Sequence, residues 1–231
     1  MEKGEEGTRL MQVVIAALNE EKGIGLTIAE LAAHIDEPRV IVVDGRSRDR
    51  TVEVAKNSGA EIFFQDGFGK GDALAKGVKC LDPDGEYVVI TDADYTYPAE
   101  YLPGMVRILE ENPRVGMVCG NRFSGDVDPV ALRNVFSFGN KLIAIAHNML
   151  NGVNLQDPLT GLRVVRAGLL RDWQIKSKGF DIEVELNLYI ARRGYATVEV
   201  PIHYRQRLGE KKLKVSDGAS ILKRIVLEST Y

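Results

Sequence analysis

Short apolar stretches alternate with amphipathic stretches along the first half of the chain. The apolar stretches are rich in β-branched residues, which favour strands, and the stretches between them have the apolar spacing of helices. Strands are predicted at 10–18, 39–43, 60–64 and 87–91, and helices at 19–34, 49–58 and 69–80. Nearly continuous apolar strands separated by helices are typical of a parallel sheet that is covered on both faces.

The second half of the chain is less regular. It predicts strands at 115–119, 162–166 and 196–200, and helices at 130–150, 181–193 and 220–228. No internal repeat, low-complexity segment or Pro/Ser-rich linker divides the chain. We therefore expect a single α/β domain with a mixed, mainly parallel sheet and helices on both faces.

The composition is that of an ordinary globular protein, with 231 residues, 45% of them hydrophobic and 27% charged, and a formal net charge of −3. The chain has no overall basic charge that would indicate nucleic-acid binding, so any site for anions must come from a local cluster. Cys80 and Cys119 lack the spacing of a metal site and are expected to be reduced thiols. The charged N-terminus has no signal-peptide pattern, and no apolar stretch reaches the ~20 residues of a membrane span. We expect a cytoplasmic protein whose contact with a membrane, if any, is peripheral.

Two carboxylates follow the apolar strand at 87–91, in the sequence Asp92-Ala93-Asp94. In an open α/β sheet, ligands bind beyond the carboxyl ends of the strands. Carboxylate oxygens there suit Mg²⁺ or Mn²⁺, which would offset the charge of a nucleotide diphosphate. The alternative is an Asx turn or a helix cap before Pro98, but the position at the end of a buried strand favours the metal site.

Two other polar segments follow predicted strands. Asp44 ends an apolar strand and is expected to contact a nucleobase or ribose, whereas Ser47 and Asp49 are expected to cap the next helix. The glycine-rich segment 67–72 opens a helix, so its backbone N–H groups and Lys70 are candidates for contact with a phosphate or base. This segment has neither the P-loop spacing nor the position of a Rossmann fingerprint.

Basic residues cluster near the C-terminus. Five lie within ten positions: Arg205, Arg207, Lys211, Lys212 and Lys214. Most such runs are solvated surface, but the central Gly209 and the preceding strand favour a loop that closes over an anionic ligand. Arg122 and Arg133 are candidates for the same site.

In this order, the motifs resemble those of glycosyltransferase family 2, in particular the dolichyl-phosphate mannose and dolichyl-phosphate glucose synthases. The resemblance extends from about residue 12 to residue 214. It rests on six segments: Ala17-Leu18-Asn19-Glu20-Glu21, 44–51, Gly69-Lys70-Gly71, Asp92-Ala93-Asp94, Gly120-Asn121-Arg122 and Asp157-Pro158-Leu159-Thr160-Gly161. Each segment is common alone, whereas the whole set in this order is specific.

The resemblance implies a Rossmann-like GT-A fold in which residues from about 8 to 120 bind the nucleotide sugar and residues from about 121 to 231 form the acceptor side. It assigns nucleotide-sugar binding to Ala17, Asn19, Glu20, Asp44, Lys70, Asp92, Ala93 and Asp94. It assigns a Mg²⁺ or Mn²⁺ ion to Asp94 together with Asp92, and the acceptor phosphate to Arg122, Arg133, Ser137, Arg205 and Arg207. The expected catalytic residues are Asp92, Asp94, Arg122 and Arg207.

Several positions depart from the family pattern. Thr96 stands where relatives often have a further metal-ligating Gln, Gly45 where they often have a second Asp, and Lys211 where they have a hydroxyl. The segment Phe180-Asp181-Ile182-Glu183 is closer to the glucose-type members, which favours a UDP-sugar over GDP-mannose.

The expected reaction is an inverting transfer of a sugar from a donor of the UDP-glucose or UDP-N-acetylglucosamine type, or from GDP-mannose, to dolichyl or polyprenyl phosphate. A lipid phosphate carries about −1.5 to −2 charge and is already a nucleophile, so no general base is expected. The alternatives are a family 2 transferase with a soluble acceptor such as a phosphoglycerate, a sugar-nucleotide pyrophosphorylase, and a non-catalytic nucleotide-sugar-binding module. The long helix at 130–150 is either a core helix or an interfacial one, and peripheral contact is expected at the cytoplasmic face of the membrane.

Overall fold

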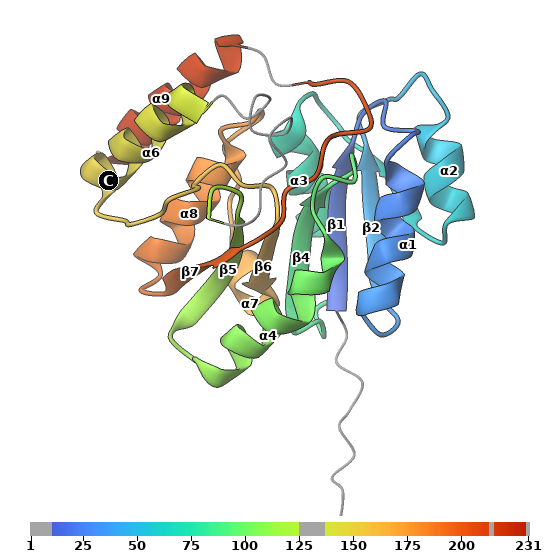
Figure 1. Cartoon of the computed structure of the whole chain (residues 1–231), viewed down its shortest axis with the longest axis horizontal. Coiled ribbons are helices and arrows are strands. Elements are labelled where there is room, and N and C mark those ends of the chain that lie inside the picture. The colour runs from blue at the N-terminus through green and yellow to red at the C-terminus, as the bar shows by residue number, and fades with distance from the viewer. Residues whose placement is uncertain (1–10, 125–136, 213–214, 230–231) are drawn as a thin grey trace, which may run out of the picture.

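Seven strands form one mixed sheet at the centre of the part of the chain that the structure describes (Figure 1). The structure is a computed structural model and describes residues 11–124, 137–212 and 215–229, without the side chains of 137–142 and 215–216. The strands are β1 (Met11–Ala17), β2 (Arg39–Asp44), β3 (Glu61–Phe64), β4 (Tyr87–Asp92), β5 (Val115–Asn121), β6 (Arg163–Arg166) and β7 (Ala196–Pro201). In the order β3-β2-β1-β4-β6-β5-β7, β6 runs antiparallel to both of its neighbours, and the other neighbouring strands are parallel. The predicted α/β fold with a mixed, mainly parallel sheet is confirmed.

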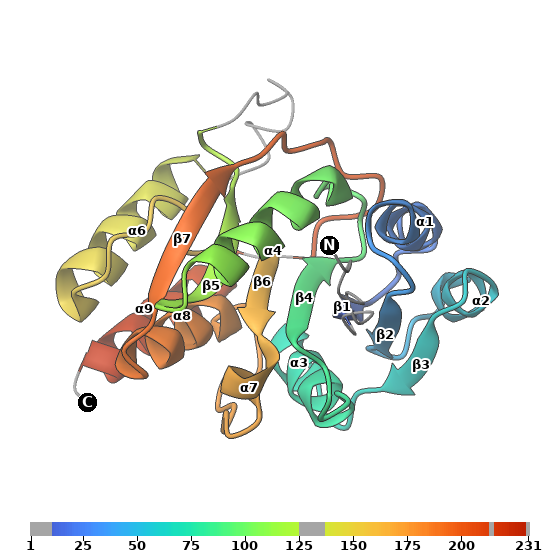
Figure 2. The same ribbon diagram turned by 90° about the horizontal axis from the view of Figure 1, so that it is seen from below.

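Helices cover both faces of this sheet, as predicted (Figure 2). The helices are α1 (Ile24–His34), α2 (Thr51–Asn57), α3 (Lys70–Lys79), α4 (Leu102–Glu111), α6 (Ser137–Asn151), α7 (Ala167–Leu170), α8 (Ile182–Arg192) and α9 (Val215–Ser229), with a 3-10 turn η1 (Ala99–Tyr101) before α4. The apolar faces of α1 and α4 pack on one side of the sheet, and those of α3, α7 and α8 pack on the other. Helices α6 and α9 lie side by side at the β7 end of the molecule, where a small apolar cluster joins them to α8.

The two apolar layers follow from the alternation of side chains along a strand. In β1, Val13 and Ile15 face the α1 and α4 side, whereas Val14 faces α3 and α8. All three are fully buried. Burying an aliphatic side chain of this size stabilises a fold by about 1.5–3 kcal/mol. Both faces of the central strands are therefore committed to the core, and polar groups collect where these strands end.

Some element boundaries differ from the prediction. Helix α1 begins at Ile24 instead of near Asn19, because Asn19 has a left-handed backbone (φ 50°) and a turn follows, in which the Glu20 carbonyl accepts from the N–H groups of Gly23 and Ile24. Helix α4 was not predicted, although its buried residues recur at helical spacing: Leu102, Met105, Val106 and Leu109. Of the helix expected at 130–150, residues 130–136 lie outside the described residues.

The sheet brings the ends of β1, β2 and β4 to one edge. Asp92 at the end of β4 pairs in register with Ala16 near the end of β1, and Ala17 pairs with Asp44 at the end of β2. Beside β6, the strand β5 runs in the same direction as β4 and ends at Asn121. Four of the segments that resemble family motifs therefore lie at this edge: 17–21, 44–51, 92–94 and 120–122.

Candidate active site

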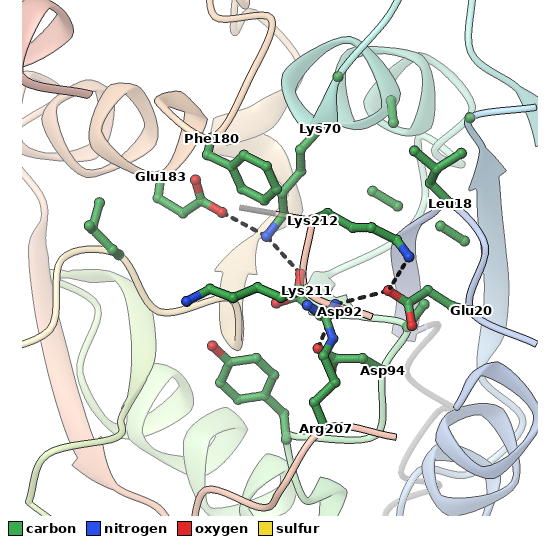
Figure 3. Close-up of a pocket in the computed structure, with 18 of the residues that line it drawn as sticks. Leu18, Glu20, Lys70, Asp92, Asp94, Phe180, Glu183, Arg207, Lys211 and Lys212 are labelled. Carbon is green, nitrogen blue, oxygen red and sulfur yellow. Dashed lines mark hydrogen bonds and ion pairs between the residues drawn. The ribbon is translucent and has the colours of Figure 1, made fainter. Parts of the chain in front are cut away.

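A cavity of about 500 Å³ opens at this edge of the sheet (Figure 3). Its size is within the range of ligand pockets, about 300–1,000 Å³. Ten of the residues predicted from the sequence line it: Ala17, Glu20, Lys70, Asp92, Ala93, Asp94, Arg122, Arg207, Lys211 and Lys212. They come from the end of β1, the start of α3, the end of β4, the end of β5 and the segment after β7. The pocket is thus assembled from distant parts of the chain.

Asp92 and Asp94 are held in different ways. Asp92 Oδ1 accepts a hydrogen bond from Lys70 Nζ at 2.7 Å. Burial by itself would raise the pKa of Asp92, but the charge of Lys70 outweighs it and holds that pKa below its usual range. Asp94 Oδ1 accepts from the Thr96 hydroxyl at 2.6 Å, and its Oδ2 lies 2.9 Å from Arg207 Nη2. Burial, followed by the neighbouring charge of Asp92, raises the pKa of Asp94. Thr96, which stands where the family pattern has Gln, therefore orients Asp94.

Part of the glycine-rich segment packs against the loop before α8. The Gly71 N–H donates to the Lys178 carbonyl at 2.9 Å. A Cβ atom on Gly69 or Gly71 would lie 2.3 Å from the carbonyl oxygen of Lys178 or Ser177, so only glycine fits here. Gly69 also has φ +89°, which L side chains rarely adopt. The N–H groups of Gly67, Gly71 and Asp72 are therefore not available to a phosphate, whereas Gly69 and Lys70 line the pocket and their contact with a ligand remains a prediction.

Lys70 is a bridge between two carboxylates. Its Nζ lies 2.7 Å from Asp92 Oδ1 and 2.7 Å from Glu183 Oε1. Despite burial, these two charges raise the pKa of Lys70. Lys70 lines the pocket, as predicted, but its charge is already paired. Its contact with a ligand remains a prediction.

Arg207 connects the C-terminal loop to the first strand. Its Nη2 lies 2.9 Å from Glu20 Oε1 and 2.9 Å from Asp94 Oδ2, while its Nε is buried without an acceptor in the described residues. The backbone N–H of Leu208 donates to the Asp94 carbonyl at 3.5 Å, which holds the loop against the end of β4. Burial raises the pKa of Glu20 to about 7, against the opposing charge of Arg207.

Arg122 is held by Asp157, an acidic residue of the segment 157–161 to which the family resemblance assigned no role. Asp157 accepts from Arg122 Nε and from Arg122 Nη2, both at 2.7 Å, and from the Arg122 backbone N–H at 3.1 Å. Both residues are buried, at 9% and 1% exposure. Arg122 also lies over the Tyr204 ring, 5.5 Å from its centroid. The pairing orients a guanidinium group at the pocket.

Other predicted residues are placed outside the pocket lining. Asp44 is fully buried and accepts from the N–H and the hydroxyl of Ser47, at 2.8 and 2.5 Å. The Ser47 hydroxyl in turn accepts from the Asn19 N–H, so Ser47 links two loops rather than capping a helix. Asp49 accepts from the Thr51 N–H at the start of α2, as a capping residue would. Asp44 and Asn19 organise the turns around the pocket, and their contact with a nucleoside remains a prediction.

Arg205 is not among the residues that line the pocket. Its guanidinium donates to both carboxylate oxygens of Glu30, at 2.6 and 2.7 Å, and lies over the Tyr95 ring. Its assignment to an acceptor phosphate is not supported by this geometry. Arg133 and Lys214 lie outside the described residues, and Ser137 begins α6 with a side chain that also lies outside them.

The carboxylates suit a hard divalent cation. Four of them line the pocket, at Glu20, Asp92, Asp94 and Glu183. Burial is the main cause that raises the pKa of Glu20 and of Asp94, and a bound cation would favour their charged forms. Across the described ranges, no group of three or more His, Cys, Asp or Glu side chains forms a complete metal site. Mg²⁺ commonly uses one or two carboxylates and takes its remaining ligands from substrate phosphates and water. The residues present therefore fit a cation that arrives with a diphosphate.

Glu183 and Tyr97 line the pocket but were not predicted as site residues. The Tyr97 hydroxyl accepts from the Gly161 N–H at 2.7 Å and so fixes the loop before β6. Glu183 is the partner of Lys70 at the start of α8. Helical periodicity alone assigns Glu183 no special role, because its neighbours Ile182 and Val184 are core residues.

Comparisons with known proteins agree with this architecture. The family model described as glycosyl transferase family 2 matches residues 12–173. A dolichyl-phosphate hexose transferase of Haloferax volcanii is 38% identical over 218 residues, which cover 94% of this chain and 92% of that protein. An undecaprenyl-phosphate mannosyltransferase of Micrococcus luteus is 32% identical, over 87% of this chain and 86% of that protein. The structure of Mycobacterium tuberculosis glucosyl-3-phosphoglycerate synthase with Mn²⁺, UDP-glucose and phosphoglyceric acid has a TM-score of 0.75 at 22% identity, covering 96% of this chain and 80% of that one, which shows a shared fold.

Proposed function

Because the chain belongs to glycosyl transferase family 2, we propose that it transfers a hexose from a nucleotide sugar to a polyprenyl phosphate. The observation that carries this proposal is the pocket in which the Asp92 and Asp94 carboxylates lie beside the guanidinium group of Arg207, with Arg122 on the same lining. The acceptor class is supported by the names of two relatives that match most of this chain. The donor proposed is a UDP-hexose, since the segment at Phe180–Glu183 resembles the glucose-type members.

The proposed reaction is a single displacement at the anomeric carbon. A phosphate oxygen of the acceptor forms a bond to that carbon, and the bond to the donor diphosphate breaks, so the electron pair leaves with the nucleoside diphosphate. Attack opposite to the leaving group inverts the anomeric configuration. The acceptor phosphate needs no general base, because it carries about −1.5 to −2 charge at neutral pH.

The chain's own residues supply position and charge. Asp94, with Asp92 beside it, would hold a divalent cation, whose positive charge offsets that of the leaving diphosphate. Arg207 presents a buried Nε that has no acceptor in the described part of the chain, and Arg122 is oriented by Asp157. Fixed donors in a buried pocket stabilise developing negative charge without reorganising during the reaction. These two arginines are proposed to bind the phosphates of donor and acceptor.

A lipid acceptor implies contact with a membrane surface. Within the described residues, no helix is long and apolar enough to cross a bilayer. Large apolar side chains are exposed on the adjacent helices α6 and α9, at Ile145, Met149, Leu150, Leu222, Val226 and Leu227. An apolar helix face of this kind can insert at the headgroup boundary. We therefore include peripheral binding at the cytoplasmic face in the proposal.

The test is a donor and acceptor panel. Purified protein with Mn²⁺ or Mg²⁺ is incubated with UDP-glucose, UDP-N-acetylglucosamine or GDP-mannose and either a polyprenyl phosphate or 3-phosphoglycerate. Mass spectrometry identifies the glycosylated product, and Asp94→Asn serves as the inactive control. A glycosyl polyprenyl phosphate is expected with one donor class. Glycosylation of phosphoglycerate without any lipid product would replace the proposed acceptor, and preference for GDP-mannose would replace the proposed donor.

A further inference from the structure

Glu183 is an acidic residue of the pocket to which the proposed reaction assigns no role. It is 6% exposed and contributes to the pocket lining. One carboxylate oxygen, Oε1, lies 2.7 Å from Lys70 Nζ, whereas Oε2 is buried and accepts no hydrogen bond from the described residues. Buried polar atoms are nearly always hydrogen-bonded, and leaving one unpaired costs about 1–3 kcal/mol. An unpaired acceptor in the wall of a ligand pocket points to a donor group on the ligand.

The position of Glu183 indicates which part of the ligand this is. Figure 3 shows Glu183 and Phe180 on the side of the pocket opposite to Leu18 and Glu20, with Asp92 and Asp94 between the two sides. In the proposed function, the nucleoside lies near the end of β1 and the diphosphate near Asp94. The group attached beyond the diphosphate of a nucleotide sugar is the hexose, and it would reach the Glu183 side.

The carboxylate is held in place before any ligand binds. Lys70 fixes Oε1 and is itself fixed by Asp92 at 2.7 Å. The loop before α8 is held by Glu185, which accepts from the N–H groups of Lys176 and Ser177 at 2.8 and 2.6 Å. The glycine contacts described above join this loop to the start of α3. A group whose surroundings fix its orientation loses little entropy on binding and therefore discriminates well.

A carboxylate only accepts hydrogen bonds, and the ring hydroxyls of a hexose can donate them. The neighbouring Phe180 ring, which also lines the pocket, offers an apolar surface to the C–H groups of a sugar ring. We propose that Glu183 accepts a hydrogen bond from a hydroxyl of the donor hexose and thereby selects the sugar. This inference rests on the proposed function and adds to it the residue that recognises the transferred group.

The test separates binding of the sugar from binding of the nucleotide. Calorimetry with Mn²⁺ measures the affinities of UDP, UDP-glucose, GDP and GDP-mannose for the wild type, Glu183→Ala and Glu183→Gln. With the preferred nucleotide, the alanine variant should bind the nucleotide hexose roughly ten- to a hundredfold more weakly, as expected for a lost hydrogen bond to a charged group. Its affinity for the nucleoside diphosphate should change less than about twofold, because that part of the ligand does not reach Glu183. The glutamine variant, which retains an acceptor oxygen, should lose less.

The matched control is Glu185→Gln. Glu185 is a buried acid on the same helix, two residues further on, but it holds the loop and does not line the pocket. This variant should lower the melting temperature without changing the ratio of the two affinities. A set of deoxyfluoro nucleotide hexoses identifies the hydroxyl, since fluorine cannot donate. The donor that lacks the relevant hydroxyl should bind the wild type and Glu183→Ala equally weakly.

The outcomes distinguish this inference from the proposed function. If the wild type binds no nucleotide sugar, both fail. If the wild type transfers a hexose but Glu183→Ala keeps its affinity for the nucleotide hexose, only the role of Glu183 is wrong. An equal loss of affinity for the nucleoside diphosphate would show that Glu183 acts only through Lys70 and Asp92, and it too would overturn the inference.

Discussion

Replacing Asp157 by alanine should destabilise the whole domain as well as the site. The substitution removes the counter-charge of Arg122, a side chain that is 10% exposed and whose partner is 1% exposed. Two side-chain hydrogen bonds of 2.7 Å and one backbone hydrogen bond of 3.1 Å are lost with it. The guanidinium stays charged in the variant, because arginine does not lose its proton in proteins even when it is buried. An unpaired charge therefore stays buried.

The expected size of the effect follows from this burial. Removing one partner of a buried ion pair costs about 3–5 kcal/mol of unfolding free energy. For a domain of this length, each kcal/mol lowers the melting temperature by about 2–4 °C, so a decrease of about 6–20 °C is expected. Replacing both partners, as in Arg122→Met with Asp157→Ala, leaves no unpaired charge, and the two single variants are Asp157→Ala and Arg122→Met. The double variant should therefore be more stable than Asp157→Ala, even though it lacks the ion pair.

Differential scanning calorimetry and urea unfolding of the wild type, both single variants and the double variant measure this coupling. Transferase activity is followed at a temperature where all four are folded. Both Asp157→Ala and the double variant should lose activity, since neither presents an oriented arginine to the pocket. A melting temperature of Asp157→Ala within about 2 °C of the wild type would refute the reasoning, as would a double variant destabilised by the full sum of the single effects.

Four further predictions concern other parts of the site. Asp94→Asn should bind Mn²⁺ more weakly and lose activity by orders of magnitude while keeping its melting temperature. Electron spin resonance of Mn²⁺ measures the binding, and scanning calorimetry measures the melting temperature. In the absence of nucleotide, Arg207→Gln should bind Mn²⁺ more tightly than the wild type does, because in the wild type Arg207 Nη2 lies 2.9 Å from Asp94 Oδ2 and competes with the ion; an unchanged affinity would contradict this. Burial raises the pKa of Glu20 from 4.5 to about 7, so the folded state binds its proton up to a higher pH than the unfolded state, and the free energy of unfolding falls as pH rises from about 4.5 to 7. Melting temperatures recorded over this pH range should show that fall for the wild type and not for Glu20→Gln. The double variant Ile145→Ser, Met149→Ser should sediment less with anionic lipid vesicles and keep its nucleotide affinity, and vesicle binding equal to that of the wild type would argue against α6 as the membrane contact.

The local features of the fold and site were available from the sequence. Strand positions follow from runs of apolar residues, because a strand buried on both faces needs them throughout. The placement of Asp92 and Asp94 was predictable for the same reason, since they directly follow such a run in the chain. Lys70 and Arg207 were candidates from their own segments, whereas the placing of Glu20 in the same site came from the family resemblance, in which residues far apart in sequence are assigned to one site.

The pairing of these residues was decided by the tertiary structure. Arg122 and Asp157 are 35 positions apart, and Arg207 and Glu20 are 187 apart. Asp157 reaches Arg122 because the loop that carries it leads into β6, which lies antiparallel between β4 and β5. Apolar periodicity reports how deeply a residue is buried but carries no information on which strands are neighbours. The paired charges of Lys70 and Glu183 therefore appear only once the fold has brought α3 and α8 together.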